Sequence, residues 1–336
     1  INESTTPATL TSSNYSISGF VTGQGATVNQ PSSVAYGDAD AGAQTISATF
    51  SITNFTANSG TLLSNYTLPT TATGAGTITP AQVLLTGVLA DNKVYDGTTV
   101  DTLNLNNVGL FGINSNDTGD VTLSQNSPGG TFSQSDVGNN LAVSINSGSF
   151  TLTGSKADDY TLVLPSDLTA NITPLALTVS GVTANNKVYD GTTADTLNTG
   201  GATLNGVIGS DQVSLVSSSA SGTFSQSNVG NGLAVTVGGL SLTGAAAGNY
   251  TVTAPTGLSA DITPAPLTIT MTGATEKTYD GTEGVTLGQN DFTITGFVTG
   301  QSAVVSQSSG SYASPNAGTG IAVTATLQPS DFTTAS

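Results

Sequence analysis

Apolar and polar residues alternate along short stretches of this chain, and stretches of this kind return throughout its length. Leu141, Val143 and Ile145 alternate with small or polar residues in "LAVSI", and "YTLVL", "LAVTV" and "LTITM" show the same period of two. Alternation over five to seven residues is typical of a β-strand with one buried face. Clusters such as "NSNDTGD" and "TGSKADD" separate the stretches and favour turns. No window has the apolar spacing of an amphipathic helix, so an all-β fold is predicted.

Recurring phrases at nearly constant spacing mark internal repeats. The tyrosine of "KVYDGTT" is Tyr95, it returns as Tyr189, and a looser copy, "KTYDGTE", contains Tyr279, at intervals of 94 and 90 residues. The phrase "ITP" recurs with the same two intervals. We therefore predict a tandem array of domains. The first domain lacks the opening Tyr-Asp-Gly motif and the last lacks the closing Ile-Thr-Pro motif, so both are expected to be truncated domains. The predicted domains are 1–80, 81–174, 175–264 and 265–336.

The number of strands in each repeat indicates its fold. Each middle repeat offers about six or seven short strands in about ninety residues, which predicts an antiparallel β-sandwich of immunoglobulin-like size. The alternative is a β-grasp-like domain with one short helix, for which 106–116 and 203–212 are the candidate stretches.

Short, stiff connections are expected between the repeats. Pro80, Pro174 and Pro264 each stand between the last strand of one repeat and the first strand of the next. Proline fixes its own φ and holds the preceding residue extended. Without a Gly- or Ser-rich linker, neighbouring domains cannot rotate freely, so the prediction is a semi-rigid row of domains.

The motif that opens each repeat combines a lysine, a tyrosine and an Asp-Gly pair. Asp-Gly favours a tight turn, and a lysine three residues before the aspartate predicts a local ion pair or a lysine stem over the tyrosine. An exposed ion pair contributes at most about 1 kcal/mol. We interpret the motif as a structural joint of every repeat, with a repeated ligand site as the alternative. Its residues are Lys93, Tyr95, Asp96 and Gly97, then Lys187, Tyr189, Asp190 and Gly191, and finally Lys277, Tyr279, Asp280 and Gly281.

Composition narrows the range of functions. The 336 residues include 21 acidic side chains against 4 lysines and no arginine, a formal charge of −17. Such a chain cannot neutralise phosphates, so neither nucleic acid nor an anionic membrane surface is an expected partner. No apolar run is long enough to insert into a bilayer. Without His, Cys or Arg, the common nucleophilic and phosphoryl-transfer machineries are missing, and the prediction is that the chain is not an enzyme.

Two kinds of additional site are alternatives to purely structural loops. Acidic loops at 36–42, 114–120 and 156–160 offer the oxygen ligands that Ca²⁺ prefers, although none has the spacing of a known calcium loop. We expect solvated turns there, and no metal or other cofactor. A Lys–Asn or Lys–Asp amide crosslink needs a buried lysine and a proton-relaying acid, usually glutamate, which the middle repeats lack.

The order of three phrases resembles a known family. "KVYDGTT", then "GNYT" some sixty residues later, and then "ITPAPLT" are similar to the tandem YDG-type and related MBG-type repeats of very large secreted bacterial proteins. Many of those proteins are filamentous-haemagglutinin-like adhesins exported by two-partner secretion. The resemblance covers 81–174 and 175–264 fully and 265–336 in part. It implies an extracellular stalk or matrix protein, and it carries over no catalytic residue.

The expected function is therefore mechanical. We predict a repeat region at a bacterial cell surface or in a biofilm matrix, serving adhesion, biofilm cohesion or filament formation, whose partners are the neighbouring repeats. One alternative is a set of lectin-like modules that contact polysaccharide through exposed aromatic residues. Another is a subunit that assembles with copies of itself by strand complementation.

Overall fold

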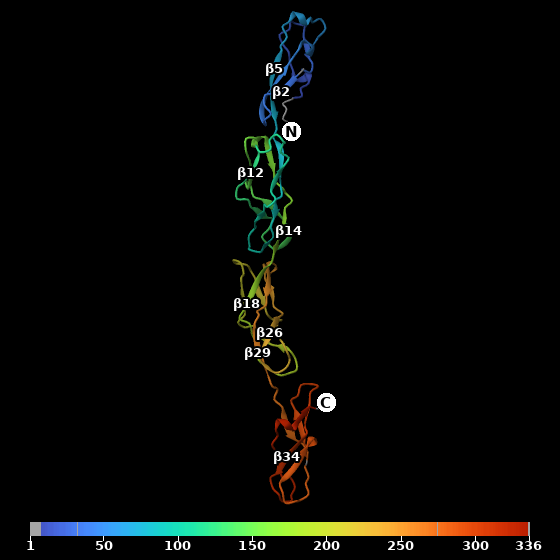
Figure 1. The fold of residues 1–336 in the computed structure, drawn as a ribbon, viewed down its shortest axis with the longest axis vertical. Helices are drawn as coiled ribbons and strands as arrows, with labels where there is room; N and C mark the ends of the chain where they lie inside the picture. Colours follow the sequence, from blue (N-terminus) through green and yellow to red (C-terminus); the bar gives the residue numbers. More distant parts are fainter. Residues whose placement is uncertain (1–7, 32, 274, 335–336) are drawn as a thin grey trace. The chain divides into compact units, whose positions relative to one another are not determined.

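The computed structural model of this chain describes residues 8–31, 33–273 and 275–334. Regular structure in these ranges consists of β-strands and single 3₁₀ turns, which confirms the predicted all-β fold class (Figure 1). Contacts divide the chain into two compact units, Ile1–Leu175 and Ala176–Ser336. None of the described segments forms a helix with the length and apolar character needed to span a bilayer.

The first unit contains the first two repeats. In the first repeat the strands are β1 (Ala26–Val28), β2 (Ser33–Tyr36), β3 (Gly42–Thr49), β4 (Phe55–Ala57) and β5 (Thr71–Ile78). In the second repeat they are β6 (Ala81–Thr86), β7 (Leu89–Ala90), β8 (Lys93–Val94), β9 (Val100–Asp101), β10 (Leu103–Asn104), β11 (Gly109–Phe111), β12 (Thr122–Gln125), β13 (Gly130–Phe132), β14 (Gly138–Ile145), β15 (Phe150–Thr153), β16 (Tyr160–Val163) and β17 (Thr169–Thr173). The 3₁₀ turns of this unit are η1 (Ser12–Asn14), η2 (Ile52–Asn54), η3 (Leu63–Asn65) and η4 (Ala157–Asp159).

The second unit contains the third and fourth repeats. In the third repeat the strands are β18 (Leu175–Ser180), which begins at the unit boundary, β19 (Thr183–Ala184), β20 (Lys187–Val188), β21 (Ala194–Asp195), β22 (Leu197–Asn198), β23 (Thr203–Asn205), β24 (Ser214–Val216), β25 (Ser221–Phe224), β26 (Gly230–Gly238), β27 (Ser241–Thr243), β28 (Tyr250–Thr253) and β29 (Leu258–Thr263). In the fourth repeat they are β30 (Thr268–Met271), β31 (Gly284–Gly288), β32 (Phe292–Thr295), β33 (Ala303–Val305), β34 (Gln307–Tyr312), β35 (Val323–Ala325) and β36 (Phe332–Thr334). The turns are η5 (Ala247–Asn249), η6 (Gln289–Asp291) and η7 (Pro329–Asp331).

The two middle repeats have the same sheet topology. The second repeat has a three-stranded sheet, β11-β6-β16, and a five-stranded sheet, β8-β17-β14-β13-β9, and the third has β23-β18-β28 and β20-β29-β26-β25-β21. This agrees with an array of β-sandwich domains. The stretches 106–116 and 203–212 contain strands β11 and β23 and turns, so the short helix of the β-grasp-like alternative does not form in either.

The immunoglobulin-like prediction was of antiparallel pairing throughout, and the structure differs from it in several strand pairs. Strand β16 pairs in parallel with β6, β17 with β8, and β29 with β20. A parallel pair needs a long crossover, and here most of a repeat separates the two partners. In the second repeat, β16 therefore runs in the direction of the opening strand β6, and the closing strand β17 runs in the direction of β8.

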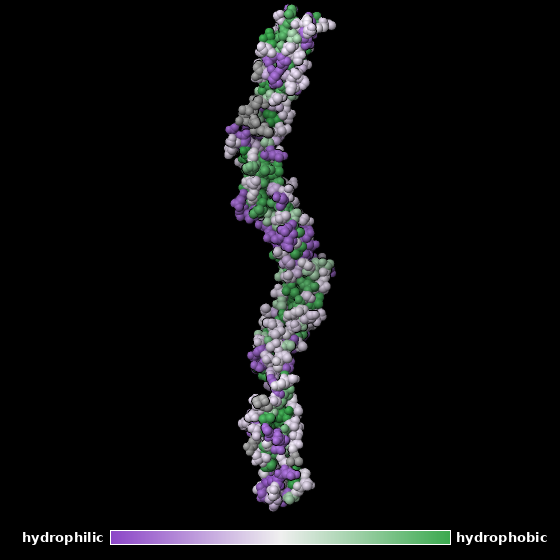
Figure 2. All heavy atoms as spheres, turned by 90° about the vertical axis from the view of Figure 1, so that its right-hand side faces the viewer, coloured by the Kyte–Doolittle hydropathy of each residue, from purple (hydrophilic) through white to green (hydrophobic). Residues whose placement is uncertain are grey.

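Each core draws its side chains from one repeat. Leu177 and Val179 are buried and alternate with exposed neighbours along β18, as the period-two pattern predicts. A cluster of Phe224, Val235, Ala260 and Ile262 forms the centre of the third repeat, and separate clusters lie in the first and second repeats. On the face in Figure 2 the apolar atoms accordingly form separate areas with polar atoms between them.

Candidate functional site

The motif of the second repeat folds into a loop around the ammonium of its lysine. Lys93 Nζ lies 2.7 Å from Asp96 Oδ1, and it donates to the carbonyl oxygens of Thr98 and Val100 at 2.9 Å each. A further bond of 3.1 Å reaches Thr98 Oγ1. Four oxygen atoms from three residues therefore surround one cation.

The same loop occurs in the third and fourth repeats. Lys187 and Lys277 lie 2.7 and 2.8 Å from their aspartates. Both ammonium groups also donate to a threonine carbonyl, to the hydroxyl of that threonine, and to a carbonyl two residues later. The partners are Asp190, Thr192 and Ala194 for Lys187, and Asp280, Thr282 and Gly284 for Lys277.

The aspartate organises the turn as well as the ion pair. Asp96 Oδ1 accepts from Thr98 N and from Thr98 Oγ1, both at 2.9 Å, and Gly97 has φ +76°. Burial acts to raise the pKa of Asp96, but the bonds from Lys93 and Thr98 outweigh it and the pKa is lowered. Hydrogen bonds from Lys187 and Lys277 lower the pKa of Asp190 and of Asp280 to about 2.

This loop differs from the exposed ion pair expected from the sequence. The Lys93 side chain is only 15% exposed, and its Nζ lies 5.8 Å from the centroid of the Phe132 ring. Lys187 has the same position over Phe224, at 5.7 Å. The ammonium therefore lies over a phenylalanine and not over the tyrosine of the motif. The recurring threonine of "YDGT" was the signal that could have identified the third partner.

The tyrosines of the three motifs have three different environments. Tyr95 is 5% exposed and Tyr279 is 66% exposed. Tyr189 lies between these extremes, and its hydroxyl accepts a 2.6 Å bond from Gln301 Nε2 of the following repeat. Of the two motif tyrosines in the second unit, Tyr189 thus contacts the next domain, whereas Tyr279 is exposed.

A second recurring loop surrounds another tyrosine in each of the first three repeats, which in the sequence is only a marker of the period. Tyr160 Oη donates to Asp117 Oδ2 at 2.5 Å and accepts from Asn114 N at 3.1 Å. Burial raises the pKa of Tyr160, and the bond to Asp117 adds to the effect. Tyr66 and Tyr250 make the equivalent pairs of bonds, to Gln24 and Val21 and to Asp211 and Ile208 respectively.

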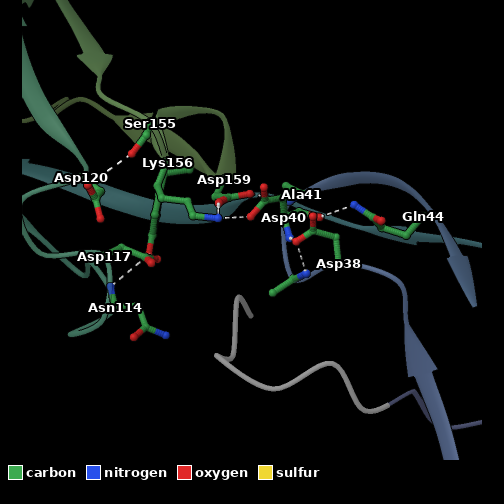
Figure 3. Close-up of polar contacts among 12 residues, drawn as sticks. Asp38, Asp40, Ala41, Gln44, Asn114, Asp117, Asp120, Ser155, Lys156 and Asp159 are labelled. Atoms are coloured by element: carbon green, nitrogen blue, oxygen red, sulfur yellow. Dashed lines mark hydrogen bonds and ion pairs between the residues drawn. The ribbon is translucent and has the colours of Figure 1, made fainter.

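The three acidic loops considered for Ca²⁺ come together where the first repeat meets the second (Figure 3). The cation among them is Lys156, the lysine outside the motifs. Its ammonium pairs with Asp40 of the first repeat and lies 3.7 Å from Asp159 Oδ2. Asp159 Oδ1 accepts from the backbone N–H of Ala41, again across the repeat boundary. The hydrogen bond to Asp40, with the charges nearby, raises the pKa of Lys156.

This arrangement favours an ammonium-bridged joint over the metal and crosslink alternatives. No group of three or more metal-ligating side chains suited to an ion occurs within the described ranges. An amide crosslink needs an uncharged lysine amine, whereas the carboxylates around Lys156 stabilise its charged form.

Two carboxylates in the middle repeats lie inside the cores and were not predicted. Asp101 is 4% exposed and Asp195 is 8% exposed, and neither carboxylate makes a hydrogen bond of normal geometry with a described residue. Burial raises the pKa of both carboxyls. Each pairs across the sheet with a glycine, and in the fourth repeat the equivalent place opposite Gly310 is occupied by Val285. The repeated "DTLN" was the available signal.

Comparison with protein families covers most of the chain. The model of the YDG domain matches residues 79–170, 173–257 and 263–334. This chain belongs to the YDG-domain family. Each matched segment contains one lysine loop, so this loop recurs in all three YDG domains. Comparisons with curated proteins and with solved structures give no match.

The lysine loops of the YDG domains are suited to holding a turn closed. Each ammonium already donates to a carboxylate, a hydroxyl and two carbonyls, and each aspartate carries its own set of donors. Such saturation leaves neither group poised as an acid, a base or a nucleophile. The prolines Pro80 and Pro174 lie between consecutive strands, β5 and β6 or β17 and β18, and Pro264 directly follows β29.

Proposed function

We propose that this chain is part of the repeat region of an extracellular bacterial surface or matrix protein, where its YDG domains act as spacers in adhesion, biofilm cohesion or filament formation. The role is mechanical: each domain holds its own fold and transmits force to the next. The partners are the neighbouring repeats, and no chemical step is assigned to the chain.

Direct contacts between consecutive repeats carry this proposal. The first and second repeats are joined by the Lys156–Asp40 ion pair and by the bond from Ala41 to Asp159. The third and fourth repeats are joined by the bond from Gln301 to Tyr189. These bonds act beside the short strand-to-strand connections, and contacts of this kind limit bending at a joint. A protein that only needed to keep domains soluble would not require them.

The surface supports a spacer better than a lectin. Glycan-binding repeats are expected to present an aromatic residue at the same place in each domain. In the second repeat Phe111 is 68% exposed and pairs across the sheet with Leu84. The equivalent place is Asn205 in the third repeat and Thr295 in the fourth. The exposed aromatic of the second repeat is therefore not a feature of the array.

Pulling single molecules tests the mechanical role. Stretching the chain between its ends should give separate unfolding events, each releasing roughly 300 Å of contour because about ninety residues extend by about 3.5 Å each. Unfolding of the whole chain in one event, or at forces no higher than those needed to extend an unfolded polypeptide, would contradict the proposed spacer role. Binding of the chain to a polysaccharide array would favour the lectin alternative if it were retained after Phe111→Ser, because the binding would then not depend on the exposed aromatic residue of a single repeat.

Labelling of the source cells tests the location. Antibodies raised against residues 81–264 should bind intact cells or their extracellular matrix, and protease treatment of intact cells should remove the signal. Signal only after lysis would overturn the extracellular assignment without affecting the mechanical measurement.

A further inference from the structure

The closing strand of each middle repeat is held by the motif that opens the same repeat. In the third repeat β20 pairs in parallel with β29, with Lys187 opposite Ile262. Tyr189 N donates to the Thr263 carbonyl at 2.8 Å, which extends this pairing by one bond. The phrases "NKVY" and "ITP", which recur together in the sequence, therefore meet as neighbouring strands.

Side chains add to this pairing. Asn186 Oδ1 accepts from Asp261 N at 2.8 Å, and Thr263 Oγ1 donates to the Lys187 carbonyl at 3.2 Å. The closing strand is thus bound by the backbone and the side chains of a strand only two residues long. The second repeat has the equivalents of both bonds, at 2.7 and 3.2 Å, from Asn171 to Asn92 and from Thr173 to Lys93.

The lysine of the motif connects the two edges of the five-stranded sheet. The order of this sheet is β20-β29-β26-β25-β21, so β20 and β21 are its edge strands. Lys187 belongs to β20, and its ammonium donates at 2.9 Å to the carbonyl of Ala194 in β21. In the second repeat Lys93 of β8 reaches the carbonyl of Val100 in β9 at the same distance. The sheet is therefore curved until its edges approach each other, and the ammonium joins edges that no strand pairing joins.

Tension along the chain acts directly on this arrangement. Strand β29 continues through Pro264 toward the fourth repeat, so it is pulled from its C-terminal end, whereas β20 is held from its N-terminal side through β18. Because the two strands are parallel, these opposite pulls slide one strand along the other, and all the bonds between them resist together. Bonds that are peeled open from one end break one at a time and at lower force. The lysine passes part of the tension from the short β20 to β21, which pairs with β25.

We propose that residues 186–194 form a shear clamp, which holds the closing strand of the third repeat under tension, and that residues 92–100 do the same in the second repeat. The lysine ties one edge of the sheet to the other, so the closing strand slides only when both the strand pairing and the ammonium bonds break. This inference rests on the proposed spacer role, in which tension runs along the chain. It adds a direction to that role, because the clamp strengthens a repeat only against forces that pull on its closing strand.

Pulling the full chain from chosen points tests the clamp, because a chain without cysteine accepts specific attachment points. Handles on Pro174→Cys and Pro264→Cys flank the third repeat and pull on its closing strand. Handles on Pro174→Cys and Ser218→Cys lead the force out through the turn between β24 and β25, so that β29 is not pulled. All three positions are exposed.

Lys187→Met and Asn186→Ala are the test variants. In the first geometry each should raise the unfolding rate of the third repeat at constant force about tenfold, which corresponds to about 1.4 kcal/mol lost from the barrier. In the second geometry the rate should change by less than about threefold. Asn186→Ala leaves the lysine loop intact, so it decides the question if the lysine variant does not fold. The matched control, Thr236→Val, removes a 3.3 Å bond from Thr236 Oγ1 to the Thr223 carbonyl between β25 and β26, and should change neither rate.

Two results would overturn the clamp. One is that both variants unfold at the rate of the parent chain in the first geometry. The other is that they raise the rate equally in both geometries, since the contacts would then stabilise the repeat without regard to direction. Either result leaves the spacer role standing as long as the parent chain resists force between Pro174 and Pro264. A parent chain that unfolds there at the force needed to extend an unfolded polypeptide would contradict the spacer role, and the clamp with it.

Discussion

Replacing Lys93 by methionine tests whether the lysine loop is a structural centre of a YDG domain. Methionine keeps most of the apolar stem but removes the donor to Asp96 Oδ1 and to the carbonyls of Thr98 and Val100. Leaving a polar group without its partner costs about 1–3 kcal/mol when it is buried. Because Thr98 and Val100 are exposed, water replaces part of the loss. We therefore expect the second repeat to lose about 2 kcal/mol of its free energy of unfolding.

The comparison variant Asp96→Asn separates the loop from a simple ion pair. Asparagine retains an oxygen that accepts from Thr98 N and removes the negative charge. The Asp96 side chain is 53% exposed, so this change should cost less than about 1 kcal/mol. An exposed ion pair would instead show similar, small losses for both variants.

Hydrogen exchange measured by mass spectrometry during urea titration is the appropriate assay, because a multidomain chain does not unfold in one step. Peptides from 81–174 report on the altered repeat. Peptides from 175–264 report on the third repeat, which retains Lys187 and serves as an internal control. If Lys93→Met shifts the second repeat by less than about 0.5 kcal/mol, or no more than Asp96→Asn does, the reasoning fails.

Four further outcomes are expected. Gly191→Ala should destabilise the third repeat and its contact with the fourth, because the added Cβ meets Val298. Gly281→Ala has nearly the same φ but open space around it, so it should show only the cost of positive φ, about 1 kcal/mol. If thermal melting showed equal losses of stability for the two variants, this reasoning would be contradicted. Asp195→Val should stabilise the third repeat by about 1 kcal/mol at pH 7 and by less below pH 4. Burial raises the pKa of the Asp195 carboxyl, so the stability of the native protein is greatest when this group is protonated and falls as pH rises through its pKa in the folded state. A lower stability of the variant in urea titrations at pH 7 would refute the prediction. The pKa of Asp190 is lowered, so its pH dependence is the opposite: its contribution to the stability of the third repeat should persist above about pH 4 and disappear toward pH 2. The stability of Asp190→Asn, measured against pH, should lack this decrease. Lys156→Ala should speed amide exchange around residues 38–42 without changing exchange in the third repeat, and no change at 38–42 would count against the joint.

Much of the fold could be predicted because its signals are local. The period of two predicts strands such as β18, and a spacing of three residues predicts that Lys93 lies beside Asp96. The tertiary partners could not be read in this way. The ring under Lys93 is Phe132, which comes from a different strand of the same sheet. The parallel pairs, such as β17 with β8, join strands near the two ends of a repeat, so they depend on how the chain folds over the whole repeat.

The strand pattern, the period of the repeats and the turn chemistry follow from the sequence alone, since each depends on a pattern of residues that can be read directly along the chain. The acidic loops that share Lys156 and the glutamine that reaches Tyr189 are instead consequences of the folded arrangement. Those partners are separated by 116 and 112 positions for Lys156–Asp40 and Gln301–Tyr189. Contacts over such distances follow from strand register and from the way one folded repeat meets the next, and neither property is encoded in a local pattern.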